Sequence, residues 1–324
     1  MRALLVHAWG DPTDLQLTEC DDLTAGPGEV VIDVRAVGCN FADILLVQGK
    51  YQAKPAFPFA PGSELSGVVR EVGPGVTKVT VGTRVLASVE HGAYATQARA
   101  KEAFVSALPE RMSFEEAAAF TVIYHTSYFA LVYRAPVHAG ETVLVHGAAG
   151  GVGLSAVQIA KALGARVIAT AGSAEKRAFV AAQGADLVLD SRDVGWVDEV
   201  LRATDGKGAD HVYDPVGGEV FELSLKCIAF GGNLHVIGFA SGRIPSCAMN
   251  RVMLKNIALV GLHLPAYRGK DPQKLHDATQ ALLAMYARGQ LQVAIGARFP
   301  LAEAGTALQE ISQRRIQGKV VLTT

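Results

Sequence analysis

The stretch LVHGAAGGVGLSAVQIAKALGARVIATAG, residues 144–172, decides the fold. A short apolar run ends at His146, a glycine-rich turn follows over residues 147–153, and a segment with helical character continues to a stop at Gly164. This order of strand, glycine-rich turn and helix is typical of the dinucleotide-binding motif. We therefore expect the turn to place a pyrophosphate at the start of the helix.

Within this turn, Ala148 replaces the first glycine of the GxGxxG pattern, while Gly150 and Gly153 keep the other two places. The missing side chain at Gly150 lets backbone N–H groups approach a phosphate, and Gly153 lets the helix pack closely on its strand. The alternative is a tight strand-to-helix turn that holds no ligand. The expected cofactor contacts here are Ala149, Gly150, Gly151, Val152 and Gly153.

From residue 142 onward, short apolar runs alternate with helix-length segments. Such alternation predicts a doubly wound parallel sheet and favours the dinucleotide over the empty turn. The predicted strands are 142–146, 167–170, 187–189, 211–213, 234–237 and 257–261.

The chain on either side of this block has a different texture. Residues 1–118 consist of closely spaced β-rich runs with Gly and Pro between them, which suggests a partly open barrel or rolled sheet. The tail after Pro265 is too short to form a good core alone. We expect it to complete the first domain, so that residues 1–120 and 263–324 form one domain and residues 121–262 the other.

The composition is that of an ordinary globular protein, since 50% of the 324 residues are hydrophobic, 19% are charged and the net charge is −1. Nucleic-acid binding is disfavoured because it depends on clustered Lys and Arg. The stretch 117–133 carries no Lys, Arg, Asp or Glu but is shorter than the roughly 20 residues of a membrane span, so we expect a buried helix and no membrane partner. The four dispersed cysteines favour a cytoplasmic protein without structural zinc.

The end of the quoted stretch predicts which dinucleotide binds. NAD-specific sites place an Asp or Glu on the ribose about 20 residues after the glycines, but this place holds Ala171, Gly172 and Ser173. No acid is there to repel a 2′-phosphate, and Ser173 and Lys176 can bind one, with Arg192 as a second cation. NADPH is therefore favoured over NADH. For Lys176 and its neighbour Arg177 the alternative is a solvated helix face.

Several motifs resemble, in the expected order, those of the zinc-free, zeta-crystallin-like quinone oxidoreductases of the medium-chain dehydrogenase/reductase superfamily. They are VGCNFADILLVQGKY, PFAPGSELSGVVREVGPGV, VHGAAGGVGLSAVQIAK, VYDPVGG, GGNLHVIGFASG and GKVVL, and they span nearly the whole chain. The resemblance implies a β-rich GroES-like catalytic domain joined to a Rossmann dinucleotide-binding domain. It also implies a homodimer.

The zinc enzymes of that superfamily bind their catalytic metal through a Cys and a His. Here Asn40 stands at the Cys position, and Gly62-Ser63-Glu64 stands where relatives have Gly-His-Glu, so no metal ligand set is expected. Without zinc to polarise a carbonyl, a simple ketone is hard to reduce, whereas a conjugated acceptor spreads the incoming negative charge.

The resemblance thus implies an NADPH-dependent, zinc-independent reductase of a conjugated acceptor, first of all a quinone. An enone, an alkenal or a trans-2-enoyl thioester is the alternative, and a coenzyme A thioester would use cations such as Lys50, Lys54, Arg268 or Lys270. A different class is a non-enzymatic NADPH-binding protein, either crystallin-like or RNA-associated.

By resemblance, Asn40 and Tyr51 lie at the nicotinamide end, and a Tyr at the place of Tyr51 is the proposed proton donor in related enoyl-thioester reductases. Tyr51 as a mere wall of the pocket is the alternative, and Asp43 is expected to be structural. Leu45 replaces a pocket Tyr of some relatives, which makes the site more apolar. The remaining expected cofactor contacts are Thr126, Gly238, Phe239, Ser241 and Lys319.

Overall fold

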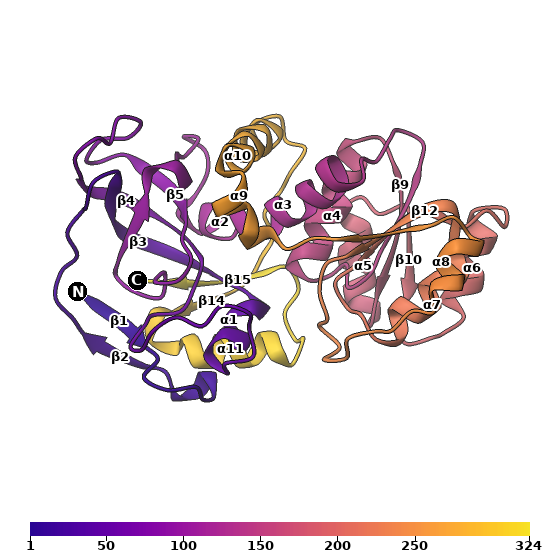
Figure 1. Ribbon diagram of the computed structural model, residues 1–324, viewed down its shortest axis with the longest axis horizontal. Coiled ribbons are helices and arrows are strands. Elements are labelled where there is room, and N and C mark those ends of the chain that lie inside the picture. Colours follow the sequence, from indigo (N-terminus) through magenta and orange to yellow (C-terminus); the bar gives the residue numbers. More distant parts are fainter. The chain divides into compact units, whose positions relative to one another are not determined.

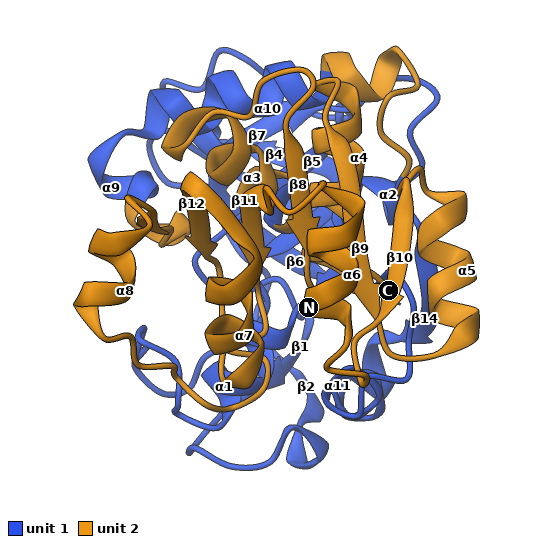
Figure 2. Ribbon diagram, turned by 90° about the vertical axis from the view of Figure 1, so that its right-hand side faces the viewer, with its two compact units in different colours: residues 1–122, 267–283, 293–324 blue, residues 123–266, 284–292 orange.

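The computed structural model describes residues 1–324, which divide into two compact units (Figure 2). Unit 1 consists of Met1–Val122, Tyr267–Leu283 and Val293–Thr324. Unit 2 consists of Ile123–Ala266 and Ala284–Gln292. The three segments of unit 1 therefore alternate along the chain with the two segments of unit 2.

The sheet of unit 2 has six parallel strands in the order β10-β9-β8-β11-β12-β13. Strands β9, β10 and β12 of this sheet are labelled in Figure 1. Each predicted strand overlaps one of the six strands, and the prediction of a doubly wound parallel sheet is confirmed. The strand order reverses between β8 and β11, and ligands of such sheets bind at this point, outside the carboxyl ends of the strands. The bounds are β8 Thr142–Val145, β9 Arg166–Ala171, β10 Leu187–Asp190, β11 Ala209–Asp214, β12 Ile228–Val236 and β13 Ala258–Gly261.

Helices cover this sheet and bury its apolar strands. Leu144, Val212 and Leu234 pack with Trp196 and Phe221 in one hydrophobic core. The helices are α3 Thr121–Tyr128, the π-helical segment η3 Phe129–Arg134, α4 Gly151–Ala162, α5 Ala174–Ala182, α6 Trp196–Ala203, α7 Glu219–Cys227 and α8 Met249–Leu254, followed by the 3₁₀ turn η4 Leu264–Ala266.

Unit 1 is built on a seven-stranded sheet in the order β14-β15-β3-β4-β5-β7, with β6 also paired to β3. Strand β15 lies between β14 and β3, so the tail completes a sheet that the N-terminal residues begin. The strands are β3 Glu29–Cys39, β4 Glu64–Val72, β5 Arg84–Ser88, β6 Gln97–Lys101, β7 Val105–Ala107, β14 Ile295–Pro300 and β15 Lys319–Thr323, and a separate pair is β1 Arg2–Leu5 with β2 Gln16–Glu19.

Helices α2 and α11 pack on this sheet, and the valines and leucines of β3, β4 and β15 form its core. The helices are α1 Phe41–Val47, α2 Phe114–Ala118, α9 Tyr267–Lys270, α10 Pro272–Ala287 and α11 Ala304–Ser312, with 3₁₀ turns η1 Pro12–Asp14, η2 Glu102–Phe104 and η5 Leu301–Glu303. The single buried helix expected over residues 117–133 is instead divided among α2, α3 and η3. None of the helices combines the length and apolar character needed to span a membrane.

Candidate active site

The glycine turn of unit 2 joins β8 to α4. A Cβ atom added at Gly153 would lie 2.4 Å from the Gly147 carbonyl oxygen and 2.8 Å from the Ala148 Cα, so the close approach of helix to turn requires glycine there. Helix α4 begins after Gly150, and no side chain caps its first N–H groups. These N–H groups and the open backbone at Gly150 fit the pyrophosphate of a dinucleotide.

Two further loops of unit 2 meet beside this turn. The Asp214 carboxylate accepts the N–H groups of Val216 (2.8 Å) and Gly217 (2.9 Å), which fixes the turn after β11. The loop after β12 is joined to that turn by the bond from the Ser241 N–H to the Val216 carbonyl, 2.9 Å. A Cβ atom at Gly147 would lie 3.4 Å from a Val216 methyl carbon.

The expected residues Gly238, Phe239 and Ser241 therefore lie in the loop next to the glycine turn. Thr126 is half-buried on α3, and its neighbour Ser127 bonds to the Val152 carbonyl oxygen at 3.0 Å, which ties this helix to the start of α4. Three segments distant in sequence thus converge at the carboxyl ends of β8, β11 and β12.

The ends of β9 and β10 form the other half of this edge. Ser173 caps α5 by accepting the Lys176 N–H at 3.2 Å. A Cβ atom at Gly172 would lie 3.5 Å from the Ser191 hydroxyl oxygen and 4.0 Å from the Arg192 Cδ. Ser173 and Arg192 therefore belong to neighbouring loops.

Asp190 is a residue at this edge that sequence reasoning missed. Its carboxylate binds the Arg177 Nη1 at 2.8 Å and the Arg192 Nη2 and Nε at 2.8 and 3.0 Å. These bonds, above all those from Arg192, hold the pKa of Asp190 well below its usual range. Asp190 directly follows the predicted strand 187–189, but nothing in the sequence indicated that it pairs with two arginines.

Unit 1 contains a buried ion pair between Lys319 on β15 and Glu64 on β4. The Lys319 Nζ donates to Glu64 Oε1 (2.9 Å), Asn40 Oδ1 (2.7 Å) and the Cys39 carbonyl oxygen (2.7 Å). The lysine and glutamate side chains are only 4% and 0% exposed. Because the ammonium group has three hydrogens, this network occupies all of them. The cofactor contact expected of Lys319 therefore stays a prediction. In the structure, the Lys319 ammonium group has no N–H left to donate to a cofactor.

The second carboxylate oxygen of Glu64 and the side-chain amide nitrogen of Asn40 are also hydrogen-bonded in this network. Glu64 Oε2 accepts the Thr121 hydroxyl (2.9 Å) and the Val122 N–H (2.8 Å). The Asn40 Nδ2 donates to Glu64 Oε1 at 2.9 Å. Gly38 leaves room for this carboxylate, since a Cβ atom there would lie 2.5 Å from it.

These residues do not fit a catalytic zinc ion. The polar atoms of Asn40 and Glu64 bond to one another and to Lys319, and burial raises the pKa of the adjacent Cys39 thiol to about 12. No cluster of three His, Cys, Asp or Glu side chains in the chain could hold a metal ion.

A second buried acid, Asp43, lies on α1 beside this network. Its Oδ2 accepts the Asn40 N–H at 2.8 Å and the Tyr94 hydroxyl at 3.0 Å. Burial raises the pKa of Asp43 to about 7. Tyr94, which is fully buried, was not singled out from the sequence.

Tyr51 follows α1 and is half-buried. Its N–H bonds to the Leu45 carbonyl at 3.0 Å, and it packs against a cluster that includes Leu46, Val47 and Phe59. Burial and the charge of Asp43 raise the pKa of Tyr51, so its hydroxyl keeps its proton at neutral pH.

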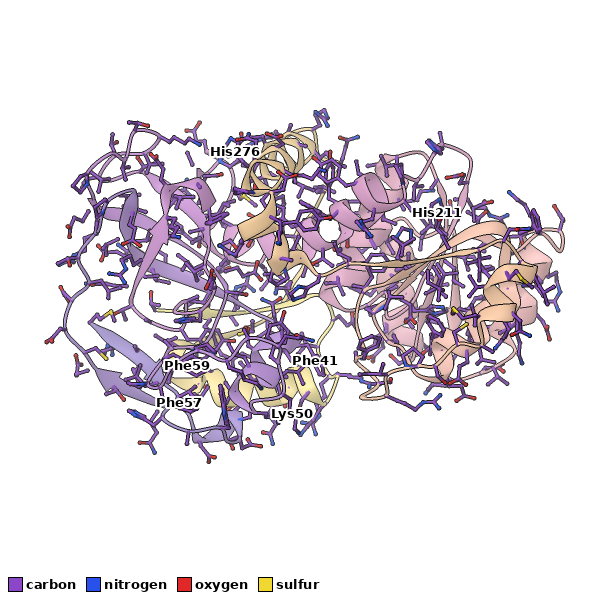
Figure 3. The ribbon with its side chains drawn as sticks, in the orientation of Figure 1. Phe41, Lys50, Phe57, Phe59, His211 and His276 are labelled. Carbon is purple, nitrogen blue, oxygen red and sulfur yellow. The ribbon has the colours of Figure 1, made fainter.

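Of the cations considered for a thioester, two have partners inside unit 1. The Arg268 guanidinium donates to the Val89 carbonyl at 3.1 Å and lies over the Phe104 ring at 4.5 Å, and burial lowers its pKa to about 10. Lys54 bonds to the Gly49 carbonyl and lies over the Trp9 ring. Lys50 is exposed near α1 (Figure 3). Arg268 is thus committed to the fold of unit 1.

Two family models match the chain. The model for the alcohol dehydrogenase GroES-like domain covers residues 26–113, and the model for zinc-binding dehydrogenases covers residues 151–284. A curated relative, the quinone oxidoreductase-like protein 2 homolog of Nematostella vectensis, is 39% identical over 326 residues, covering 100% of this chain and 89% of the relative.

Solved structures of similar proteins cover the chain equally well. The quinone oxidoreductase of Escherichia coli, crystallised with NADPH, is 31% identical with a TM-score of 0.94, and all of both chains is covered. The CurK enoyl reductase is 28% identical with a TM-score of 0.89, covering 99% of this chain and 98% of that one.

Proposed function

The chain belongs to the quinone oxidoreductase group of the medium-chain dehydrogenase/reductase superfamily, and on that premise we propose that it is an NADPH-dependent, zinc-independent reductase of quinones. Membership makes it an oxidoreductase; the acceptor and the site residues are the proposal. The observation that carries it is the edge of unit 2, where an uncapped helix start, the loop after β12 and Ser173 beside Arg192 lie at successive strand ends.

In this proposal the cofactor extends along that edge. Backbone N–H groups of residues 149 and 151–153 bind the pyrophosphate, because the Gly150 N–H already donates to the Gly147 carbonyl oxygen at 3.0 Å. Ser173, Lys176 and Arg192 bind the 2′-phosphate. Thr126 and the loop with Gly238, Phe239 and Ser241 contact the nicotinamide half. The NADPH complex of the E. coli quinone oxidoreductase supports this choice of cofactor. The dinucleotide-binding domain is then residues 121–262 and the catalytic domain residues 1–120 with 263–324.

When bound, the cofactor supplies the hydride. Tyr51 supplies the proton: its O–H bond breaks as a new bond to hydrogen forms on the acceptor, and its oxygen regains a proton from solvent. The acceptor thereby loses one π bond and gains two hydrogens in total. Asn40 is proposed to shape the site from the start of α1, with its amide held by Glu64 and Lys319.

A second candidate is reduction of an enone or a trans-2-enoyl thioester. The similarity to the CurK enoyl reductase favours this second function. So does Tyr51, because a tyrosine at its place is the proposed proton donor in related enoyl-thioester reductases. A coenzyme A ester would rely on Lys50 or Lys270, both exposed, since Arg268 is already bonded.

The test is a steady-state screen of NADPH and NADH oxidation against 1,4-naphthoquinone, alkenals and enoyl-CoA esters. We expect naphthoquinone with NADPH to give the highest kcat/KM. Fastest turnover of an enoyl-CoA ester would move the assignment to the second candidate, and equal use of NADH would contradict the assignment of the 2′-phosphate site.

Tyr51→Phe tests the proton donor, with Tyr286→Phe as the matched control. We expect Tyr51→Phe to lower kcat while leaving the NADPH dissociation constant unchanged, because the hydroxyl acts only in proton transfer. Full activity of Tyr51→Phe would make the residue a wall of the pocket.

We also propose that two copies associate through β13. This strand pairs only with β12, so its outer edge presents unpaired backbone groups. Large exposed apolar side chains precede it, including Ile244, Met253 and Leu254, which are 74%, 67% and 71% exposed. A second β13, antiparallel across a two-fold axis, would satisfy both edges.

Sedimentation of the purified protein tests this association. We expect a dimer that Met253→Glu converts to monomers, while Val81→Glu, on an equally exposed apolar position of unit 1, leaves it intact. A monomeric wild type would refute the association.

All four cysteines are free thiols, which supports the proposed cytoplasmic location.

A further inference from the structure

Asp43 is a buried carboxyl group that the proposed reaction does not use. It is 2% exposed and lies in the first turn of α1, where the Asn40 N–H and the Tyr94 hydroxyl both donate to the same oxygen, Oδ2. Burying an acid is costly unless it is neutralised or paired. A carboxyl group kept in such a place can change its charge near neutral pH.

Tyr51 is attached to the same helix. The chain leaves α1 in a turn in which the N–H groups of Lys50 (2.7 Å) and Tyr51 (3.0 Å) both bond to the Leu45 carbonyl. The Tyr51 ring packs against Leu46 and Val47 of that helix. One short helix and one turn therefore connect the Asp43 carboxyl to Tyr51, and after burial the charge of Asp43 is the second cause that raises the pKa of the Tyr51 hydroxyl.

The other charged and titratable groups around Asp43 are few. Lys319 from β15 favours its ionised form, Glu64 from β4 disfavours it, and the Tyr94 hydroxyl stabilises it. The Cys39 thiol is the remaining titratable neighbour, and burial keeps it protonated. Helix α11 also packs on α1, but its one charged residue, Glu310, is bonded to Arg315.

We propose that Asp43 is a positioning residue for proton delivery, whose protonation state determines how readily Tyr51 releases its phenolic proton. The proposal rests on the proposed function. Asp43 itself transfers no proton to the acceptor. In the step, the Tyr51 O–H bond breaks, the acceptor gains that hydrogen, and the tyrosinate that remains takes a proton from solvent.

The effect has a defined sign. When Asp43 is ionised, a second negative charge forming on Tyr51 is repelled, so the phenol is a weaker acid. When Asp43 is protonated, that repulsion disappears and proton release is easier. Because burial raises the pKa of Asp43 to about 7, acceptor reduction is expected to slow as pH rises through neutrality.

The direct test is the titration of Tyr51 in the cofactor-free protein, followed by NMR of tyrosine labelled with ¹³C at Cζ. Tyr51→Phe assigns the resonance. In Asp43→Asn, whose amide oxygen can still accept from Asn40 and Tyr94, we expect the pKa of Tyr51 to fall toward its ordinary value of 10. An unchanged Tyr51 titration would overturn the proposal.

The pH profile of acceptor reduction is the second readout. We expect the wild type to lose activity across pH 6–8, and Asp43→Asn to show no fall in that range. Asp33→Asn, an exposed acid paired with Arg70 in unit 1, should keep the wild-type profile. If activity still falls across pH 6–8 in Asp43→Asn, the fall is caused by another titratable group and the proposal is contradicted.

Two further variants keep the outcomes distinct. If Asp43→Asn does not fold, Tyr94→Phe removes one donor to the carboxylate and should move the fall in activity to higher pH. If Tyr51→Phe proves fully active, the proposed proton donor is wrong, while the NMR titration still decides whether Asp43 acts on Tyr51.

Discussion

Unit 2 forms its candidate cofactor site from backbone at neighbouring strand ends, whereas unit 1 forms its buried network from side chains on four distant segments. In unit 2 the main requirements are a glycine at residue 153 and an uncapped helix start. In unit 1, Asn40, Glu64 and Lys319 bond to one another, and Tyr94 bonds to the adjacent Asp43. We therefore expect single side-chain changes to cost less at the cofactor site of unit 2 than in the buried network of unit 1.

The largest effect is expected from breaking the ion pair of unit 1. Lys319→Met leaves the Glu64 carboxylate buried without its cation, which should lower the free energy of unfolding by about 3–5 kcal/mol. The double variant Glu64→Gln with Lys319→Met should recover part of that loss, because no buried charge remains. Urea unfolding measures both.

Arg202→Ala, which removes an exposed ion pair of unit 2, is the control and should change stability little. If Lys319→Met proved as stable as the wild type, unit 1 would not depend on the side chains of its buried network, and this difference from unit 2 would be contradicted.

A glycine of unit 2 should give the next largest effect. In Gly153→Ala, the new Cβ meets backbone atoms that cannot move aside, and such overpacking costs about 1–3 kcal/mol. The shift of turn against helix should also weaken NADPH binding by at least about tenfold, measured by fluorescence titration. Gly269→Ala, with open space around its Cβ, should bind normally. Normal binding by Gly153→Ala would show that side chains carry this site as well.

The smallest effect is expected at Arg192, whose side chain is 68% exposed. Arg192→Ala should weaken NADPH binding only a few-fold, since solvent screens the charge, and should leave NADH binding unchanged. Asp190 stays paired with Arg177 in this variant, so the fold should be retained. Equal losses for the two cofactors would place Arg192 outside the 2′-phosphate site.

The six strands and the glycine turn of unit 2 could be predicted because each is a local pattern of a few residues. The Lys319–Glu64 pair could not, since its members are far apart and each alone looks like an ordinary charged residue of a strand. Asp190 shows the same limit within unit 2: it directly follows a predicted strand, but its partners come from a helix and a loop. The division of residues 117–133 among α2, α3 and η3 depends on packing, which propensity does not encode.

The insertion of β15 between β14 and β3 has a consequence for synthesis. Residues 29–72 emerge from the ribosome long before residues 319–323, so the nascent N-terminal strands wait through the translation of all of unit 2 for the neighbour that completes their sheet. Until then Glu64 has no ammonium partner and an edge of β3 stays open. Unit 2 is therefore the first unit whose sheet can be completed during translation, while the N-terminal strands of unit 1 stay incomplete until the last residues are made.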